Sequence, residues 1–339
     1  MVGGNQERRN LRGLTHPIHT AQGGFGRARL AETAPDYPER AQALSRNPYT
    51  QVRSERVPRI VVAESARTGV RQASPPSHHQ RRTPEHPMTP TALVTGGAKG
   101  IGAATAHALA AGGHTVVVHH RNDAERALAV VSSLPGHGHA IVQGDLGDPE
   151  IARDVVAAAV HAVGGIDVLV NNAGVYDEHP PTATTYEDWQ AAWKKVFDIN
   201  VFGAANVSWA VIEHLMHRPQ GSDGARIIFI GSRGAYRGEP DAPAYGASKA
   251  AVHSLSQSLA VHLAPHGIAV SAVAPGFTRT ELTSDMLAGP HAAAIRAQSP
   301  FGRTGEASEI ASAVAWLATP VATWASGTVI DLNGASHLR

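Results

Sequence analysis

Residues 91–332 contain seven short apolar runs, rich in β-branched residues and separated mostly by helix-like segments. The runs lie near residues 91, 115, 140, 167, 227, 269 and 328. Strands that alternate with helices pair in one parallel sheet, and right-handed crossovers place the helices on both of its faces. We therefore expect an α/β fold with a doubly wound parallel sheet of about seven strands, in a single domain over residues 88–339.

Residues 1–87 have a different composition. They contain 14 Arg, no Lys and 7 acidic residues, whereas the whole chain has a net charge of +1. Apart from Ile60-Val61-Val62-Ala63 they lack sustained apolar periodicity, so we predict a disordered N-terminal extension. The alternatives are a transit peptide, a basic nucleic-acid-binding arm, and a translation start at Met88 that leaves the extension out. Acidic residues and prolines between the arginines argue against the first two.

Composition also excludes several classes of site. The chain has no Cys, which rules out disulfides, thiolate metal sites and cysteine nucleophiles. Its 20 His are scattered, and no H-x-x-x-H or similar spacing is accompanied by acidic partners, so we expect no metal. The small net charge implies no general affinity for nucleic acid or membranes, and no stretch reaches the ~18 apolar residues of a membrane span. We expect a cytoplasmic protein.

A glycine-rich turn joins the first strand of the domain to the first helix. Thr91–Thr95 is followed by Gly96-Gly97-Ala98-Lys99-Gly100-Ile101-Gly102 and then by a helix-like segment. Glycines allow a tight turn and a close approach of the backbone, and the helix start offers free N–H groups to a pyrophosphate. This order predicts a Rossmann-type dinucleotide site, although a tight connection without a ligand is the alternative.

The next two strands end at residues that can contact a nucleotide. His119-His120-Arg121-Asn122 places Arg121 where an enzyme that prefers NAD usually has an acidic residue. Arg121, assisted by Lys99, can neutralise a 2′-phosphate, so we predict NADP(H) over NAD(H), unless Arg121 is only a solvated charge. The third strand ends at Gly144-Asp145-Leu146. The carboxylate of Asp145 can accept from the adenine amino group or cap the helix that begins near Pro149.

Further polar residues occur at the ends of later elements. Asn171-Asn172-Ala173-Gly174 follows the fourth strand, and Asn200 lies within a helical periodicity over 189–216, where it is either exposed or recruited. Ser232 follows the strand 226–230 and can donate to a substrate carbonyl. Pro275-Gly276-Phe277-Thr278 forms a rigid turn with an available hydroxyl. The segment 279–303, of mixed polarity, is a candidate lid.

Tyr245 and Lys249 are four residues apart at the start of a predicted helix. This spacing places a phenol and an ammonium on the same helix face. A nearby positive charge favours the phenolate, which brings the tyrosine closer to working pH as an acid or base. A surface pair at helical spacing is the alternative for these two residues alone.

Taken together, these motifs resemble the short-chain dehydrogenase/reductase family, and among its members the β-ketoacyl carrier-protein reductases. The resemblance runs from about Thr91 to Asn333 and rests on six motifs in order: Thr95-Gly96-x-x-x-Gly100-Ile101-Gly102, Asn171-Asn172-Ala173-Gly174, Asn200, Ser232, Tyr245-x-x-x-Lys249 and Pro275-Gly276.

The resemblance implies a role for each matching residue. Tyr245 would be the general acid in reduction and Ser232 would polarise the substrate oxygen. Lys249 would bind the cofactor ribose and lower the pKa of the tyrosine, and Asn200 would position a water in a proton relay. The cofactor would be held by Gly96, Lys99, Gly100, Ile101, Gly102, Arg121, Asp145, Leu146, Asn172, Ala173, Gly174, Tyr245, Lys249, Pro275, Gly276 and Thr278.

The resulting functional hypothesis is an NADP(H)-dependent oxidoreductase that acts on a small carbonyl compound or secondary alcohol. A sugar or alcohol dehydrogenase that works in the oxidative direction is one alternative. A non-catalytic NADP sensor is the other, although a sensor can dispense with Tyr245, Lys249 and Ser232. The resemblance also implies a homo-oligomer, either a dimer or a tetramer. Substrate identity depends on the predicted lid, which carries no recognisable motif.

Overall fold

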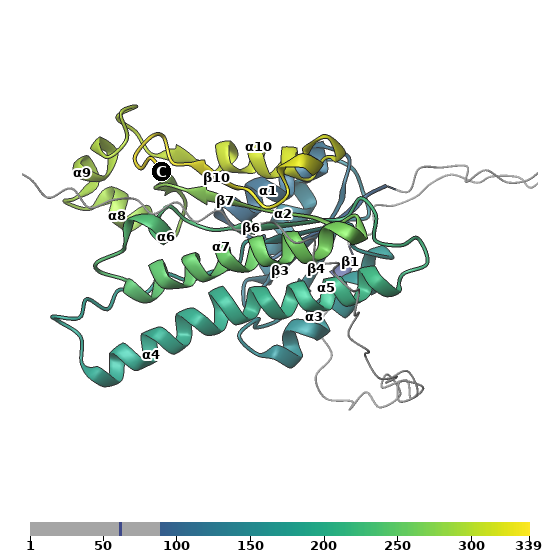
Figure 1. The fold of residues 1–339 in the computed structure, drawn as a ribbon, viewed down its shortest axis with the longest axis horizontal. Helices are drawn as coiled ribbons and strands as arrows, with labels where there is room; N and C mark the ends of the chain where they lie inside the picture. Colours follow the sequence, from purple (N-terminus) through teal and green to yellow (C-terminus); the bar gives the residue numbers. More distant parts are fainter. Residues whose placement is uncertain (1–60, 63–88) are drawn as a thin grey trace, which may run out of the picture. The chain divides into compact units, whose positions relative to one another are not determined.

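The structure of this protein is a computed structural model that describes residues 61–62 and 89–339, all within one compact unit, Glu55–Arg339. The predicted disorder of the other residues in 1–87, and the proposed start at Met88, lie outside the described residues. The described part consists of a central sheet between two layers of helices (Figure 1).

The central sheet has eight strands in the order β1-β4-β3-β2-β5-β6-β7-β10. They are β1 (Val61–Val62), β2 (Thr91–Val94), β3 (Thr115–His120), β4 (Ala140–Gln143), β5 (Val168–Asn171), β6 (Arg226–Ile230), β7 (Ala269–Pro275) and β10 (Val329–Leu332). The seven strands from β2 onward pair in parallel and confirm the predicted sheet. The sequence analysis did not count β1, which pairs antiparallel with β4 at the edge.

Strands β2 to β7 are buried on both faces because successive side chains alternate between two apolar cores. Leu93 and Val117 belong to one core, whereas their neighbours Val94 and Val118 belong to the other. Each fully buried aliphatic side chain of this kind stabilises the fold by about 1.5–3 kcal/mol. Continuous apolar strands of this type require helices on both sides of the sheet.

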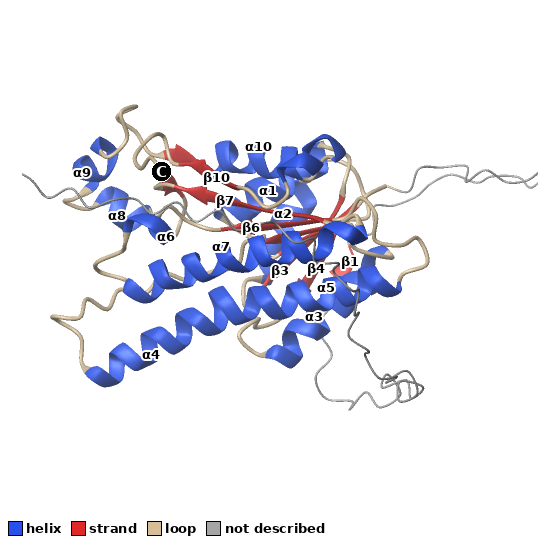
Figure 2. Ribbon diagram, viewed as in Figure 1, coloured by secondary structure: helices blue, strands red, loops and turns tan. Residues whose placement is uncertain are grey.

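Two sets of helices supply that cover. The first core packs against α3 (Pro149–Val163), α5 (Ala204–His217) and α7 (Pro243–Leu263), and the second packs against α1 (Gly100–Ala111), α2 (Ala124–Ser133) and α10 (Ala307–Leu317). Figure 2 shows the red strands between these two blue layers. Helix α4 (Tyr186–Phe197) leads into α5 through a π-helical segment, η2 (Asp198–Gly203). Two 3₁₀ turns, η3 (Ala264–His266) and η4 (Pro320–Ala325), complete the layers.

The remaining elements lie beyond the carboxyl ends of the strands, on the left in Figure 1. They are α6 (Gly234–Arg237), α8 (Ser284–Ala288), α9 (Ala292–Ala297) and a small parallel pair, β8 (Thr278–Arg279) with β9 (Gly305–Glu306). Open α/β sheets bind ligands at this edge. The segment 279–303, which the sequence analysis predicted to be a lid, contains the short helices α8 and α9 and lies at this edge of the sheet.

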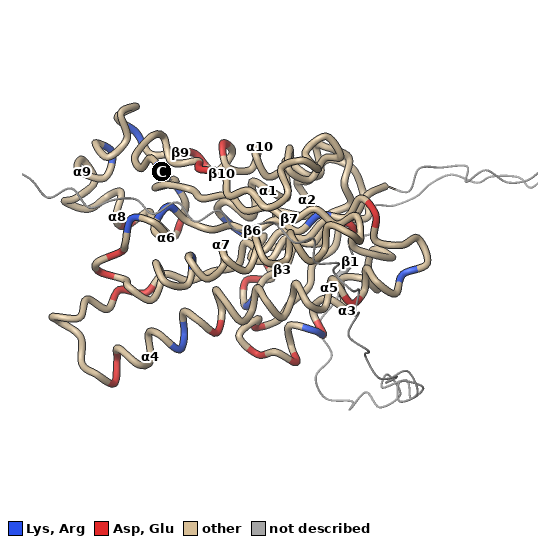
Figure 3. Tube along the Cα trace, viewed as in Figure 1, with Lys and Arg blue, Asp and Glu red and all other residues tan. Residues whose placement is uncertain are grey.

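Charges of both signs alternate along the described trace, and most of the central strands carry none (Figure 3). Among residues 89–339, no group of three or more His, Cys, Asp and Glu side chains is arranged to hold a metal ion. None of the described helices combines the length and apolar character that crossing a membrane requires.

Candidate active site

Tyr245 and Lys249 lie one turn apart near the start of α7. The helix begins at Pro243, which suits a first helical position because proline has no N–H to leave unpaired there. Lys249 is buried, and its Nζ donates a hydrogen bond of 2.8 Å to the carbonyl oxygen of Ile230. The same Nζ lies 5.7 Å from the centre of the Tyr245 ring. The predicted pair therefore shares one helix face and points at the end of β6.

Ser232 follows β6 and meets Tyr245 across the site. Its hydroxyl accepts a hydrogen bond of 3.0 Å from the backbone N–H of Gly234, the first residue of α6. Ser232 and Tyr245 line the same pocket, and the Ser232 side chain is near enough to lower the pKa of Tyr245. The strand end and the helix start therefore bring two hydroxyl groups, 13 residues apart in sequence, to one point.

The protonation of this group differs from the prediction. Burial raises the pKa of Tyr245 to about 12; the neighbouring Ser232 side chain opposes this rise and the charge of Glu239 adds to it. Burial lowers the pKa of Lys249 to about 8. The prediction that Lys249 lowers the pKa of Tyr245 is wrong for this structure. Burial destabilises the Tyr245 phenolate because it removes the negative charge from water. The ammonium of Lys249 does not offset this loss of hydration, since it lies 5.7 Å from the ring centre and donates to the carbonyl oxygen of Ile230.

Asn200 is recruited, and the helix around it is irregular. The helical periodicity predicted over 189–216 is interrupted by η2, which contains Asn200. Its side-chain oxygen accepts from the N–H of Val175 at 2.8 Å, and its nitrogen donates to Ser248 at 3.0 Å. A β-carbon at Gly174 would lie 3.3 Å from the Asn200 oxygen and 3.4 Å from Nζ of Lys249. Asn200 and Lys249 thus flank Gly174, and such π turns occur often at functional sites.

The glycine turn is held from the side by the residues after β5. Gly96 and Gly100 have φ values of +61° and +54°, which favour glycine. The side-chain amide of Asn172 donates to the carbonyl oxygens of Thr95 and Gly96, at 2.9 and 3.0 Å. Thr95 Oγ1 in turn accepts from the N–H groups of Asn172 and Ala173. The side chain of Asn172 therefore fixes the turn.

The start of α1 can receive an anion. Lys99 is the N-cap, it is exposed, and its side chain makes no capping hydrogen bond. The first turn contains no acidic residue, so its N–H groups and the positive end of the helix dipole are unopposed. A β-carbon at Gly102 would lie 2.3 Å from the carbonyl oxygen of Gly96. Only glycine at 102 permits this close approach.

His119 links the glycine turn to the end of β4. Its Nδ1 accepts from the N–H of Gly96 at 3.0 Å, and its Nε2 donates to the carbonyl oxygen of Gly144 at 3.1 Å. Burial lowers the pKa of His119 to about 4, so the ring is neutral at pH 7 and can accept at one nitrogen while it donates at the other. The sequence analysis missed this role of His119. The one signal in the sequence was its position at the end of a strand, which is not enough to predict these two hydrogen bonds.

Arg121 and Asp145 face each other beyond these strand ends. Their side chains are half-exposed and 4.0 Å apart, at the outer limit of an ion pair. Asp145 accepts from the N–H of Gly147, whereas α3 is capped by Asp148, which accepts from Glu150 and Ile151. The prediction that Asp145 caps this helix is therefore wrong, because Asp148 directly precedes Pro149. Leu146 is buried beside the π segment, where its carbonyl oxygen approaches Gly203.

The turn after β7 is closely packed. Gly276 donates to the carbonyl oxygen of Leu332, and a β-carbon there would lie 2.9 Å from Cα of Asn333. Pro275 is the last residue of β7. Thr278 is buried, and its hydroxyl donates to the carbonyl oxygen of Gly276 at 3.1 Å. The hydroxyl that the sequence offered to a ligand is thus engaged with its own turn.

Comparisons with known proteins identify the family of this chain. A family profile described as short chain dehydrogenase matches residues 90–290. The chain is 39% identical over 247 residues, 72% of its length, to an uncharacterized oxidoreductase of Methylorubrum extorquens, of which it covers 96%. It is 36% identical to a 3-oxoacyl-[acyl-carrier-protein] reductase of Synechocystis, covering 72% of this chain and 95% of that one. The chain belongs to the short-chain dehydrogenase/reductase family.

A solved structure of the same family has a similar fold. A short-chain dehydrogenase from Burkholderia cenocepacia in complex with NADP superposes with a TM-score of 0.65 at 35% identity, over 74% of this chain and 98% of that one. As a short-chain dehydrogenase/reductase, the present chain is an oxidoreductase with a nicotinamide-cofactor fold. Its uncapped α1 start and its side-chain-free approach at Gly102 fit a dinucleotide pyrophosphate.

The short-chain dehydrogenase/reductase site opens into a pocket of about 80 Å³. Ser232, Tyr245, Pro275 and Gly276 line it, together with residues that the sequence analysis did not single out: Tyr176, Arg233 and Glu239, and, from the predicted lid, Leu282, Thr283 and Met286. The rings of Tyr176 and Tyr245 meet edge to face, with centres 5.2 Å apart. Burial raises the pKa of Tyr176, and the charge of Glu239 adds to this rise. No spacing motif marks these residues, because all but Met286 of α8 come from loops and turns.

Proposed function

We propose that this enzyme reduces small carbonyl compounds with NADPH, and that Tyr245 is the proton donor. The observation that carries the proposal is that Ser232 and Tyr245 line one pocket at the carboxyl edge of the sheet, with the buried Lys249 one helical turn from Tyr245. Two hydroxyl groups at one point can both contact a carbonyl oxygen, and such donors stabilise the negative charge that develops there.

Four residues of the site would have separate roles in the reduction. When bound, the nicotinamide supplies the hydride. Because the pKa of Tyr245 is about 12, its phenol is protonated at neutral pH and holds the proton that the carbonyl oxygen takes up. Ser232 orients that oxygen. Lys249 carries a positive charge below its pKa of about 8, and Asn200 lies across Gly174 from it, on the route by which we expect the proton to be replaced.

The preference for NADP(H) over NAD(H) is supported by the end of β3. Arg121 stands there in place of an acidic residue, and its 4.0 Å contact with Asp145 is long enough to leave the guanidinium available. A half-exposed arginine can bind a 2′-phosphate through two parallel hydrogen bonds. Lys99, exposed at the α1 start, adds a second positive charge.

The oxidative direction and a non-catalytic NADP sensor are the other candidates. A sensor needs neither a buried lysine nor a serine and a tyrosine in one pocket, yet both features occur in this site. We also expect a homo-oligomer, since α5 and the preceding turn expose Phe202, Trp209 and Met216. Large apolar side chains grouped on one surface are typical of subunit interfaces.

The test is a panel of ketones and aldehydes followed through the loss of NADPH absorbance. We expect Tyr245→Phe to lower kcat by about a thousandfold or more while the affinity for NADPH stays within about twofold. Tyr176→Phe is the matched control, because it removes a neighbouring phenol from the same pocket, and it should retain most of the turnover. Normal turnover in Tyr245→Phe would refute Tyr245 as the donor. Failure of the wild-type enzyme on every carbonyl would refute the reductase proposal.

A further inference from the structure

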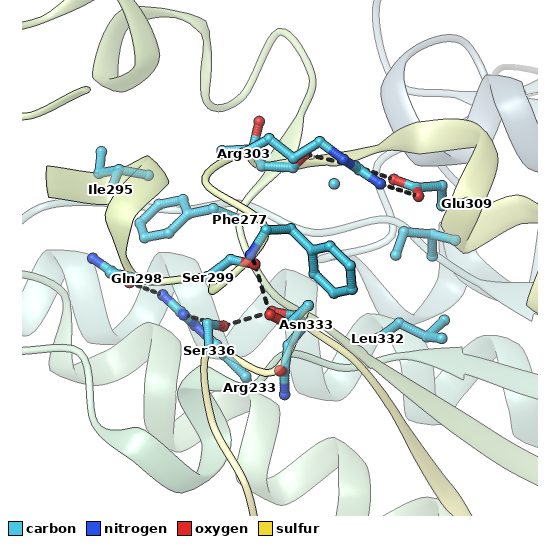
Figure 4. Close-up of a pocket in the computed structure, with 15 residues that line it drawn as sticks. Arg233, Phe277, Ile295, Gln298, Ser299, Arg303, Glu309, Leu332, Asn333 and Ser336 are labelled. Atoms are coloured by element: carbon cyan, nitrogen blue, oxygen red, sulfur yellow. Dashed lines mark hydrogen bonds and ion pairs between the residues drawn. The ribbon is translucent and has the colours of Figure 1, made fainter. Parts of the chain in front are cut away.

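A second, larger pocket adjoins the first. It has a volume of about 230 Å³ and lies between α9, β9, α10 and the C-terminal residues (Figure 4). Arg233 and Phe277 line both pockets. Arg233 directly follows Ser232 in sequence. Because it lines both pockets, it connects the smaller pocket, which contains Ser232 and Tyr245, with the larger one.

The guanidinium of Arg233 is buried, and its hydrogen bonds go to neutral groups. The residue is 5% exposed, and its two terminal nitrogens donate to the hydroxyl of Ser336 and the side-chain oxygen of Gln298. Its carbon Cζ lies 5.0 Å from the centre of the Phe277 ring. Figure 4 shows these two hydrogen bonds at the floor of the pocket. Among residues 61–62 and 89–339, no carboxylate comes within ion-pair distance of Arg233.

A buried guanidinium without an anion is an unusual arrangement. Charges removed from water are normally paired, because the lost hydration is otherwise uncompensated. Arginine has five N–H donors, and the described contacts of this side chain engage two groups. The neighbouring Arg237 adds positive charge, since it donates to the same oxygen of Gln298. The site thus has donors and charge to spare for an anion.

Two nearby groups serve as comparisons. Arg303 lines the same pocket, but its guanidinium forms two hydrogen bonds of 2.8 and 2.7 Å with the carboxylate of Glu309 and is already neutralised. Glu239 lines the smaller pocket and acts on Arg233 only from beyond ion-pair distance. Burial raises the pKa of Glu239, and the charges of Arg233 and Arg237 oppose this rise. Arg233 is therefore the arginine of this pocket that an incoming anion can bind.

We propose that Arg233 binds a carboxylate of the substrate, so that the preferred substrates are oxo acids and the corresponding hydroxy acids. The ketone would lie at Ser232 and Tyr245, and the carboxylate would extend past Phe277 to the guanidinium. A planar carboxylate matches the fork of N–H groups that a guanidinium presents. The proposal rests on the proposed reductase function and assigns its substrate class.

The first test compares oxo acids with their methyl esters. A series with increasing chain length between ketone and carboxylate is assayed with NADPH, each acid against its own ester. In the wild-type enzyme we expect kcat/KM of the best acid to exceed that of its ester by about ten- to a hundredfold. Esters that equal or surpass every acid would overturn the proposal. This comparison needs no variant and is independent of any folding defect.

The second test removes the guanidinium. In Arg233→Gln we expect the acid-to-ester ratio to fall to about one, mainly through a higher KM for the acid, and Arg233→Lys to keep an intermediate ratio. Arg296→Gln is the matched control, since it removes an exposed charge from α9 that lines neither pocket. It should keep the wild-type ratio. An unchanged ratio in Arg233→Gln contradicts the assignment.

A binding measurement separates this proposal from the reductase proposal. Hexanoate has no ketone or aldehyde group to reduce. Calorimetry should detect its binding to the wild-type enzyme, and its affinity for Arg233→Gln should be lower by at least about tenfold. If neutral ketones are reduced while the acids show no higher kcat/KM than their esters and hexanoate does not bind, only the carboxylate proposal is wrong. If no ketone, acid or ester is reduced, the reductase proposal is wrong, and hexanoate binding still decides whether Arg233 forms an anion site.

Discussion

The Nζ atom of Lys249 lies 5.7 Å from the centre of the Tyr245 ring, and its hydrogen bond goes to the carbonyl oxygen of Ile230. The two pKa values, about 8 for Lys249 and about 12 for Tyr245, have a consequence. As pH rises, the lysine loses its charge before the phenol begins to ionise. In the enzyme without added cofactor, Lys249 therefore cannot stabilise the phenolate.

We expect no phenolate from Tyr245 up to about pH 10 in this state. The measurement is the phenolate absorbance of the wild-type enzyme minus that of Tyr245→Phe during a pH titration. Lys249→Met should give the same difference curve, because the charge it removes is already absent where the tyrosine titrates. A Tyr245-dependent phenolate near neutral pH that disappears in Lys249→Met would show that the lysine controls the tyrosine after all.

Arg121 is expected to set the choice of cofactor. Arg121→Gln should reduce kcat/KM for NADPH by about ten- to a hundredfold and leave that for NADH within about threefold, because only NADPH carries the 2′-phosphate. Arg126→Gln is the control: its guanidinium lies near Asp123 and Glu281, so the NADPH-to-NADH ratio should not change. Equal losses with both cofactors in Arg121→Gln would assign Arg121 a structural role.

Gly102 is expected to tolerate no side chain. In Gly102→Ala the new β-carbon would lie 2.3 Å from the Gly96 carbonyl oxygen and 2.5 Å from the amide of Asn172, so the glycine turn must open. Overpacking of this kind costs about 1–3 kcal/mol of unfolding free energy, and NADPH affinity should fall with it. Gly165→Ala is the control, since its β-carbon meets its neighbours only at 3.6 Å or more. Urea unfolding and NADPH fluorescence titration measure both effects.

His253 is expected to make the fold sensitive to acid. Its ring nitrogens have no hydrogen-bond partner among the described residues, and burial, with a contribution from the charge of Lys249, lowers its pKa to about 4. Between about pH 6.5 and pH 4 the unfolded chain binds the proton and the folded chain does not. This group therefore lowers stability as pH falls through that range, by on the order of 3 kcal/mol in total.

The variant His253→Leu tests this pH dependence. Its unfolding free energy should change less between pH 7 and about pH 4.5 than that of the wild-type protein. His262→Leu, at an exposed position on the same helix, should keep the wild-type dependence. The two curves are compared by urea unfolding at each pH. Parallel curves for wild type and His253→Leu would refute the role of this ring.

The sequence predicted what depends on local pattern. The seven parallel strands of the central sheet, β2 to β7 and β10, were found because each combines β-branched residues with a turn at its end. Tyr245 and Lys249 were paired because helical spacing fixes which residues share a face. The contacts of Tyr176, Glu239 and Arg233 were missed, since they depend on where loops settle against one another. The direction of the Tyr245 pKa shift was also wrong, because the extent of burial is a tertiary property.

The π turn at Asp198–Gly203 has a consequence for how this sequence can vary in length. Each residue of a helix advances the chain by about 100° around the axis. Deleting one residue from the turn would restore a regular helix and rotate α4 by that angle relative to α5, which would take Asn200 away from Val175 and Ser248. Insertions and deletions should therefore be tolerated in the surface loops, whereas the number of residues between α4 and α5 should not change.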